Sequence, residues 1–256
     1  MKTAAIVPAA GRGERLGPGL PKALRALGGA PLLAHAVRAL ARSRAISLVV
    51  VAAPRDGVDQ ARAMLTEHHA GAELLVVAGG ASRQISVRLA LDALPADVEA
   101  VLVHDAARPL TPVDLIDAVA AAVHAGADAV VPGLRVVDTV KRVRTDTTGP
   151  DTARTGAEPG TETVVETVER ASLRAVQTPQ GFRRSVLAAA HEAASLAALD
   201  GVGADIEATD DAGLVERIGG TVRVIPGEDD AFKVTRPIDF DLAEAVLARR
   251  RTDGVP

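Results

Sequence analysis

The sequence of 256 residues contains no cysteine, no tryptophan and no tyrosine, and only three phenylalanines. The absence of cysteine excludes disulfide bonds, thiolate metal sites and cysteine nucleophiles. Because aromatic residues make up 1% of the chain, the hydrophobic core must be built from alanine, valine and leucine. The scarcity of aromatic residues also argues against a reader of single-stranded nucleic acid, which stacks bases on aromatic side chains.

An excess of positive charge is also missing, since the formal net charge at pH 7 is -4. Duplex nucleic acid requires a basic surface, so this balance argues against such a partner. The longest apolar stretch, residues 115–134, is interrupted by Asp117, His124 and Asp128 and does not suit a membrane span. Pro8 lies where a signal peptide would have to be apolar. The sequence therefore predicts a soluble cytoplasmic protein, with no membrane and no nucleic acid as partner.

Two common kinds of catalytic or metal site are not indicated. The six histidines show no ligand spacing, so a zinc site is not predicted. No Gly-x-Ser-x-Gly nucleophile motif occurs in the chain. The sequence therefore indicates neither a zinc centre nor a serine nucleophile of this kind.

Strand and helix patterns alternate along most of the chain. Short apolar runs predict strands at residues 3–7, 46–52, 73–77, 98–104, 173–176 and 221–225. Helical patterns predict helices at residues 32–40, 57–68, 82–94, 112–125, 185–199 and 239–250, with a short helix after Thr209. This alternation predicts an α/β fold with a Rossmann-like, open and mostly parallel sheet flanked by helices.

The alternation is interrupted after residues 130–132. Residues 135–144 and 163–168 have the pattern of two strands, and we predict that they form a protruding β-arm at about 134–170. Between them, residues 145–162 are rich in threonine, glycine, proline and acidic side chains, and this composition predicts a flexible insertion. We interpret 1–256 as a single domain that carries this arm.

The loop after the first predicted strand has the composition of a polyphosphate site. Gly11 and Gly13 allow backbone amides to approach a ligand closely. Arg15 and Lys22 then supply two cations. The loop is neither a Walker motif, because Lys22 is not followed by serine or threonine, nor a dinucleotide fingerprint, because Leu16 replaces its last glycine. A plain surface loop is the alternative, but the position after a parallel strand favours a ligand site.

Other polar residues have more than one interpretation. Asp105 and Arg108 follow a predicted strand, where they suit a metal or sugar hydroxyl and a phosphate, or form an ion pair that shapes a turn. Thr178 lies in a stretch typical of a turn, and Thr209 in one typical of a helix cap. Taken alone, Lys233 has the pattern of an ordinary strand lysine.

The order and combination of these motifs are more specific than any one of them. From residue 3 to about 248 the chain resembles the 2-C-methyl-D-erythritol 4-phosphate cytidylyltransferase family of the non-mevalonate isoprenoid pathway. The resemblance is carried by residues 9–16, 21–22, 79–80 with Arg83 and Ser86, 104–109, 138–141, 167–170, 178–182, 209–211 and 233–237. Departures from the family pattern occur at Ala81, where an acid is frequent, and at Ala23 and Ala231.

The resemblance implies a nucleotidyltransferase-type fold that transfers CMP from CTP to 2-C-methyl-D-erythritol 4-phosphate and releases pyrophosphate. It implies catalytic roles for Arg15, Lys22, Arg170 and Lys233. It implies nucleotide contacts at Pro8, Ala9, Ala10, Gly11, Gly13, Gly79, Gly80, Arg83, Ser86 and Asp105. It implies acceptor contacts at Asp105, Ala106, Arg108, Thr139, Arg170, Thr178, Thr209, Asp230 and Lys233, with Asp230 near the metal or near the Lys233 ammonium.

The resemblance also implies Mg²⁺ or another divalent cation, held mainly by the CTP phosphates, and a homodimer formed through the β-arm. Two alternatives stay open at this point. A ribitol-5-phosphate cytidylyltransferase would combine a similar loop with a different acceptor. A nucleotide-binding module would have no turnover, and such a module would not need both Arg15 and Lys22.

Overall fold

The computed structural model describes residues 1–11, 22–68, 71–145, 162–199 and 209–252. Gly13, Arg15 and most of the predicted insertion at 145–162 lie outside the described residues. The chain divides into two compact units, Met1–Pro132 with Val176–Pro256 and, separately, Gly133–Ala175. Across the described ranges, no helix is both long enough and apolar enough to cross a membrane.

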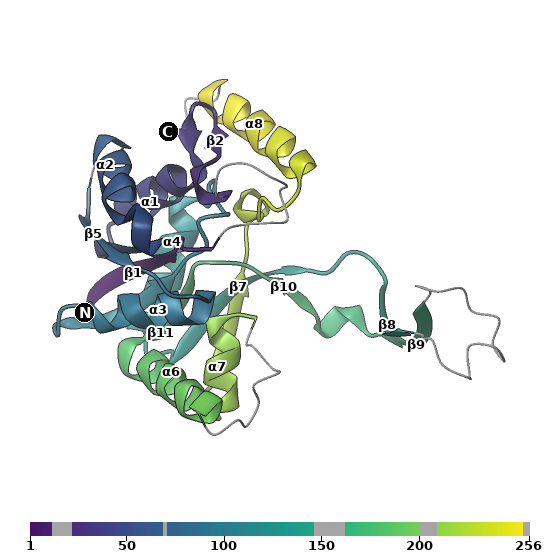
Figure 1. Cartoon of the computed structure of the whole chain (residues 1–256). Helices are drawn as coiled ribbons and strands as arrows, with labels where there is room; N and C mark the ends of the chain where they lie inside the picture. Colours follow the sequence, from purple (N-terminus) through teal and green to yellow (C-terminus); the bar gives the residue numbers. More distant parts are fainter. Residues whose placement is uncertain (12–21, 69–70, 146–161, 200–208, 253–256) are drawn as a thin grey trace. The chain divides into compact units, whose positions relative to one another are not determined.

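The main sheet joins a run of parallel strands to antiparallel ones (Figure 1). Its strands are β1 (Lys2–Pro8), β4 (Ile46–Ala53), β5 (Glu73–Ala78), β6 (Val98–Val103), β7 (Ala129–Arg135), β10 (Arg174–Val176), β11 (Gln180–Arg183) and β12 (Val222–Pro226). The order is β10-β7-β11-β6-β1-β4-β5, and β12 pairs with β7. Since β1 is parallel to β4 and β6, and β4 to β5, the predicted mostly parallel sheet is confirmed.

Helices cover both faces of this sheet (Figure 1). They are α1 (Leu32–Arg42), α2 (Val58–His68), α3 (Arg83–Asp92), α4 (Val113–His124), α6 (Arg184–Leu199) and α7 (Asp211–Arg217). One hydrophobic cluster packs α3, α6 and α7 on one face, and a second packs α1, α2 and α4 on the other. Because side chains alternate along a strand, Ile6 enters the first cluster and Val7 the second.

Strands β7 and β11 of the main sheet were not among the predicted strands, and β11 is the less recognisable of the two. It lies antiparallel between β6 and β7, with Phe182 opposite Val101 and Ala129. A Cβ atom at Gly181 would lie 2.6 Å from Cγ1 of Val119, so glycine permits close packing of α4 on this strand. A four-residue strand carries too little local pattern to be recognised, and pairing with both neighbours determines it.

The C-terminal helix α8 (Pro237–Thr252) packs beside a short hairpin of β2 (Ala26–Leu27) and β3 (Ala30–Pro31). Leu27, Val234 and Val246 belong to a small hydrophobic cluster there. The backbone N–H of Gly28 donates to the Glu244 carboxylate at 2.7 Å. This contact joins the chain that follows the β1 loop to the helix that follows Lys233.

The second unit contains the arm, whose strands β8 (Val140–Thr145) and β9 (Glu162–Val168) form an antiparallel hairpin. The first predicted strand of the arm, 135–144, was too long, because residues 136–139 are not in a strand. Arg170 donates a hydrogen bond to the Val137 carbonyl, so a side chain replaces a strand partner there. Val164 and Val165 are more than half exposed on the hairpin.

Candidate functional site

A pocket of about 260 Å³ opens where β1 and β6 end, and it also receives the loop after β5. Its lining consists of Pro8, Ala9, Ala10, Gly11, Lys22, Ala23, Gly80, Ala81, Ser82, Arg83, Ser86, Asp105, Ala106, Ala107 and Lys233. Parallel strands end at the same edge of a sheet, so loops that are distant in sequence meet there. Below, we call this cavity the nucleotide pocket, because most of the predicted nucleotide contacts lie in it.

Close backbone packing shapes one side of the nucleotide pocket. The Gly79 N–H donates to the Ala53 carbonyl at 2.7 Å. A Cβ atom at Gly79 would lie 2.6 Å from Cβ of Ala10 and 2.9 Å from Oγ of Ser86. The Gly80 N–H donates to Ser86 Oγ at 3.1 Å. Gly79, predicted as a nucleotide contact, therefore allows the loop after β5 to pack closely against the loop after β1.

A second pocket of about 210 Å³ shares Arg83, Asp105 and Lys233 with the first. Its other lining residues are Arg108, Val176, Gln177, Thr178, Gln180, Thr209 and Asp210. Three of them, Arg108, Thr178 and Thr209, were predicted acceptor contacts, and we call this cavity the acceptor pocket. Two adjoining pockets with a common charged wall allow two ligands to lie side by side.

Asp105 is held between the two cations of the shared wall. Its Oδ2 lies 2.7 Å from Nζ of Lys233, and its Oδ1 lies 3.4 Å from Nε of Arg83. Burial by itself would raise the pKa of the Asp105 carboxyl, but the charges of Arg83 and Lys233 outweigh burial and bring the pKa below its usual range. Asp105 is therefore ionised at neutral pH and orients both cations.

Arg108 was predicted to hold a phosphate, but its guanidinium contacts backbone carbonyls. Nη1 donates to Ala231 at 2.6 Å and Nη2 donates to Val176 at 3.2 Å. Nε is buried and has no hydrogen-bond partner among the described residues. Burial lowers the pKa of Arg108. The Arg108 side chain thus stabilises the turn at Ala231, which precedes Lys233.

Asp230 was expected near the metal or near the Lys233 ammonium. In the structure, its carboxylate faces helix α8 instead. Its carboxylate lies 3.1 Å from Arg249 and 2.8 Å from Arg250. The Lys233 ammonium is paired with Asp105 instead. Asp230 therefore links α8 by ion pairs to the turn at Ala231, which the Arg108 side chain also contacts.

The remaining predicted site residues fall into three groups. Thr139 and Arg170 belong to the second unit, and neither is in the described lining of the two pockets. Gly13 and Arg15 lie outside the described residues. Apart from these four residues, Gly79 and Asp230, every predicted site residue lines one of the two pockets.

His104 is a residue whose role the sequence did not indicate. It is fully buried, with Nε2 3.2 Å from the Arg108 carbonyl and Nδ1 3.1 Å from Oγ1 of Thr178. The Thr178 oxygen also accepts the Asp105 N–H at 3.0 Å. A neutral imidazole that donates from Nε2 and accepts at Nδ1 satisfies all these groups. Burial lowers the pKa of His104 to about 4.

This buried histidine predicts a stability loss in mild acid. An unfolded histidine takes up a proton near pH ~6.5, whereas folded His104 resists protonation until about pH 4. The free energy of unfolding should therefore fall by about 2 kcal/mol between pH 7 and pH 5. Urea unfolding at the two pH values measures it. A His104→Gln variant should show a flatter dependence, and an equal slope in both proteins would contradict this assignment.

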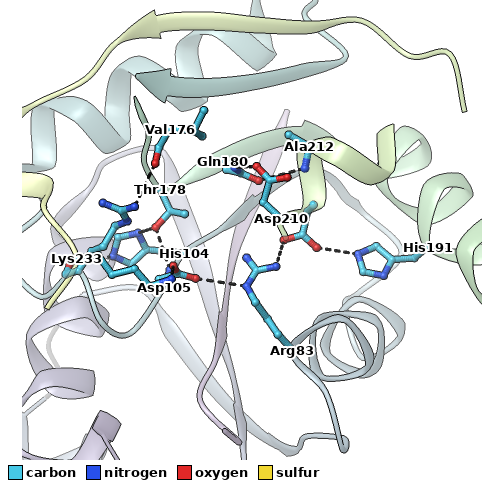
Figure 2. A network of polar contacts seen from close by, with 12 residues as sticks. Arg83, His104, Asp105, Val176, Thr178, Gln180, His191, Asp210, Ala212 and Lys233 are labelled. Carbon is cyan, nitrogen blue, oxygen red and sulfur yellow. Dashed lines mark hydrogen bonds and ion pairs between the residues drawn. The ribbon is translucent and has the colours of Figure 1, made fainter. Parts of the chain in front are cut away.

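Behind the shared wall lies a network of polar side chains (Figure 2). Arg83 Nη1 donates to Oδ2 of Asp211 at 2.7 Å, and the other carboxylate oxygen lies 2.9 Å from Nε2 of His191. Gln180 Nε2 donates to Asp210 at 2.7 Å. The motif at 209–211 pointed to this region, but its interpretation as a helix cap covers only Asp210, whose side chain accepts from the Gly213 N–H.

Comparison with known proteins identifies the family. The family model described as 2-C-methyl-D-erythritol 4-phosphate cytidylyltransferase matches residues 3–249. The protein of that name from Streptomyces avermitilis is 58% identical over 256 residues, covering 99% of this chain and 95% of the relative. The one from Frankia casuarinae is 55% identical over 248 residues, covering 97% of this chain and 82% of the relative.

Solved structures agree. The crystal structure of 2-C-methyl-D-erythritol 4-phosphate cytidylyltransferase from Thermus thermophilus is 35% identical, with a TM-score of 0.70 and coverage of 97% of this chain and 100% of that one. The 4-diphosphocytidyl-2C-methyl-D-erythritol synthase from Anaerococcus prevotii is 26% identical, with a TM-score of 0.77 and coverage of 97% and 96%. With this fold, these two adjoining pockets and these relatives, the chain belongs to the 2-C-methyl-D-erythritol 4-phosphate cytidylyltransferase family.

Proposed function

We propose that the chain transfers CMP from CTP to 2-C-methyl-D-erythritol 4-phosphate where its two pockets meet. A phosphate oxygen of the acceptor forms a bond to the α-phosphorus of CTP. The bond from this phosphorus to the bridging oxygen breaks, and its electron pair leaves with pyrophosphate. The observation that carries this proposal is the wall of Arg83, Asp105 and Lys233, which both pockets share.

The reaction requires no general base. The second pKa of a phosphate monoester is near ~6, so the acceptor phosphate is largely dianionic at neutral pH. His104, which adjoins the acceptor pocket, is engaged with Arg108 and Thr178. Catalysis then depends on in-line positioning and on cations that stabilise charge on the α-phosphate and the leaving pyrophosphate. We assign the second task to Lys22 and, by family resemblance, to Arg15.

The donor groups in the nucleotide pocket fit a metal ion that CTP itself carries. Among the described residues, no group of three or more histidine, aspartate or glutamate side chains is arranged so that it could hold a metal ion. Asp105 is the one carboxylate in the described lining of the nucleotide pocket, and two cations already contact it. Mg²⁺ is commonly held by one or two carboxylates together with substrate phosphates. When bound, it would neutralise phosphate charge, and Asp105 is the carboxylate of the described lining that could help to hold it.

Nucleotide choice provides a test of the pocket. The small residues Ala10, Gly80 and Ser86 line the pocket and would let backbone groups come close to a base, and Ala81 has no polar side chain that could contact it. We therefore expect CTP to be used at least about tenfold faster than ATP or GTP, because backbone donors and acceptors match one base edge and leave groups unpaired against others. Pyrophosphate release measures this. Equal rates with all three nucleotides would contradict base recognition by this pocket.

The same assay separates the acceptor alternatives. The family match favours methylerythritol phosphate over ribitol 5-phosphate. Product formation with methylerythritol phosphate alone supports the proposal, preference for ribitol 5-phosphate supports the alternative, and binding of CTP without any product supports a module without turnover.

We also propose that the arm makes a homodimer. A two-stranded hairpin is marginally stable by itself, and β8 and β9 expose Val143, Val164 and Val165. Association of two arms about a two-fold axis would cover these side chains on both copies. An arm that crosses to a partner would also deliver Thr139 and Arg170 to the partner's acceptor pocket. A cytoplasmic location remains a prediction from the sequence.

A further inference from the structure

A line of charged side chains runs from the shared wall of the pockets to helix α6 (Figure 2). Lys233 contacts Asp105 at 2.7 Å, and Asp105 lies 3.4 Å from Arg83. Arg83 in turn donates to Asp211 at 2.7 Å. The line ends at His191, whose Nε2 lies 2.9 Å from Asp211. Opposite charges alternate from Lys233 to Asp211, so each group is held by its neighbours.

The inner half of this line does not face the pockets. The side chains of Asp211 and His191 are 1% and 2% exposed, compared with 29% for Arg83 and 38% for Lys233. Neither Asp211 nor His191 belongs to the described lining of the two pockets. Asp211 and His191 therefore lie behind the pocket walls, and the direct side-chain contact from Asp211 to the shared wall is the one with Arg83.

Asp211 has the charge and geometry of an anchor for Arg83. One carboxylate oxygen accepts from Arg83 and the other is hydrogen bonded to His191, so both are used. Burial would raise the pKa of Asp211, but the hydrogen bond from His191 and the charge of Arg83 outweigh burial and lower it. An ionised, buried carboxylate next to a guanidinium fixes the direction of that guanidinium more strictly than an exposed pair does.

Only one of the two ring nitrogens of His191 is hydrogen bonded among the described residues. Nδ1 of His191 is buried and has no hydrogen-bond partner among the described residues. An apolar residue would fill the same space without leaving a buried polar atom unpaired. The useful property of His191 at this position is therefore the hydrogen bond from Nε2 to Asp211.

We propose that Asp211 and His191 are positioning residues, which hold Arg83 so that Asp105 keeps Lys233 in place between the two pockets. The proposal rests on the function proposed above and extends it to two residues outside the site. Without the charge on Asp211, Asp105 is the other carboxylate that pairs with Arg83. The guanidinium would then turn toward Asp105 and compete with Lys233 for it, which displaces Lys233 from the acceptor.

The first test is Asp211→Asn, assayed by pyrophosphate release with CTP and methylerythritol phosphate. The amide can keep a hydrogen bond to both neighbours if the imidazole proton moves to Nδ1, so the substitution removes mainly charge. We expect the KM for the acceptor to rise about tenfold and the KM for CTP to change less than about threefold. A lower folded fraction would reduce the apparent kcat and would leave both KM values unchanged. Asp92→Asn is the matched control, because Asp92 forms an exposed pair with Arg88 on the same helix as Arg83.

The second test compares His191→Gln with His191→Leu. Glutamine can place an N–H donor near the position of Nε2, whereas leucine cannot. We expect the glutamine variant to stay within about threefold of the wild-type acceptor KM and the leucine variant to match Asp211→Asn. The double variant of His191→Leu with Asp211→Asn should be no worse than Asp211→Asn alone.

The outcomes separate the two proposals. A wild-type protein without pyrophosphate release would overturn the proposed function. An active wild type with an unchanged acceptor KM in Asp211→Asn, or with equal acceptor KM values in the two His191 variants, would overturn the positioning role. Thermal unfolding measures whether every variant is folded. If Asp211→Asn does not fold, the comparison of His191→Gln with His191→Leu still tests the positioning role.

Discussion

Replacing Lys22 with alanine is expected to lower turnover by on the order of 10²-fold or more, with the fold intact. Lys22 lines the nucleotide pocket together with Asp105 and Lys233. Its ammonium would stabilise the charge that develops as pyrophosphate leaves, and water is a poor substitute in a closed site. Steady-state pyrophosphate release at saturating CTP measures the effect on kcat. Arg15→Ala, in the part of the loop outside the described residues, should show a loss of similar size.

Lys2→Ala is the matched control for this prediction. Lys2 starts the same strand that leads to the nucleotide pocket, and its ammonium forms an exposed pair with Asp97 at 3.0 Å. The control removes the same charge at the opposite end of β1, so turnover should be unchanged. If Lys22→Ala kept near-normal turnover, the loop after β1 would have no catalytic role.

Mixing two inactive variants is expected to restore activity if the arm serves the partner's site. Lys22→Ala and Arg170→Ala should each be nearly inactive, because each removes a cation that the reaction uses. In a dimer with crossed arms, every mixed pair has one site that keeps both residues. Random pairing in equal amounts would then give roughly a quarter of wild-type activity. Co-expression with two different affinity tags isolates the mixed dimers, and this purified sample should show about half of wild-type activity because one of its two sites is intact.

A second mixture controls for this experiment. Lys22 and Lys233 line the same pocket of one unit, so Lys22→Ala mixed with Lys233→Ala leaves every site without one lysine and should recover nothing. Recovery in both mixtures would indicate some other source of activity. If purified mixed dimers of Lys22→Ala and Arg170→Ala remain inactive, Arg170 serves its own subunit and the crossed arm is wrong.

Most of the architecture, and the family, could be predicted from local patterns and motifs in the sequence. Apolar runs separated by helical patterns are local signals, and they were enough to predict the parallel sheet and the helices on both faces. Nine ordered motifs then placed the ligand loops after strand ends, where parallel strands must bring them together. The scarcity of aromatic residues was equally informative, since the two main clusters consist mostly of alanine, valine and leucine with Phe182 as the one aromatic member.

The partners of the charged side chains could not be predicted from the sequence and follow from the way the chain folds. Arg108 and Asp230 were predicted to contact the acceptor or metal, yet one contacts carbonyls and the other pairs with arginines of α8. Asp105 meets Lys233 across 128 residues of chain, and Arg83 meets Asp211 across an equal separation. Periodicity reports which face of an element is buried, but an ion pair depends on which loops meet in space. The loops that come together depend on strand order and register, and these depend on contacts between residues that are distant in the sequence.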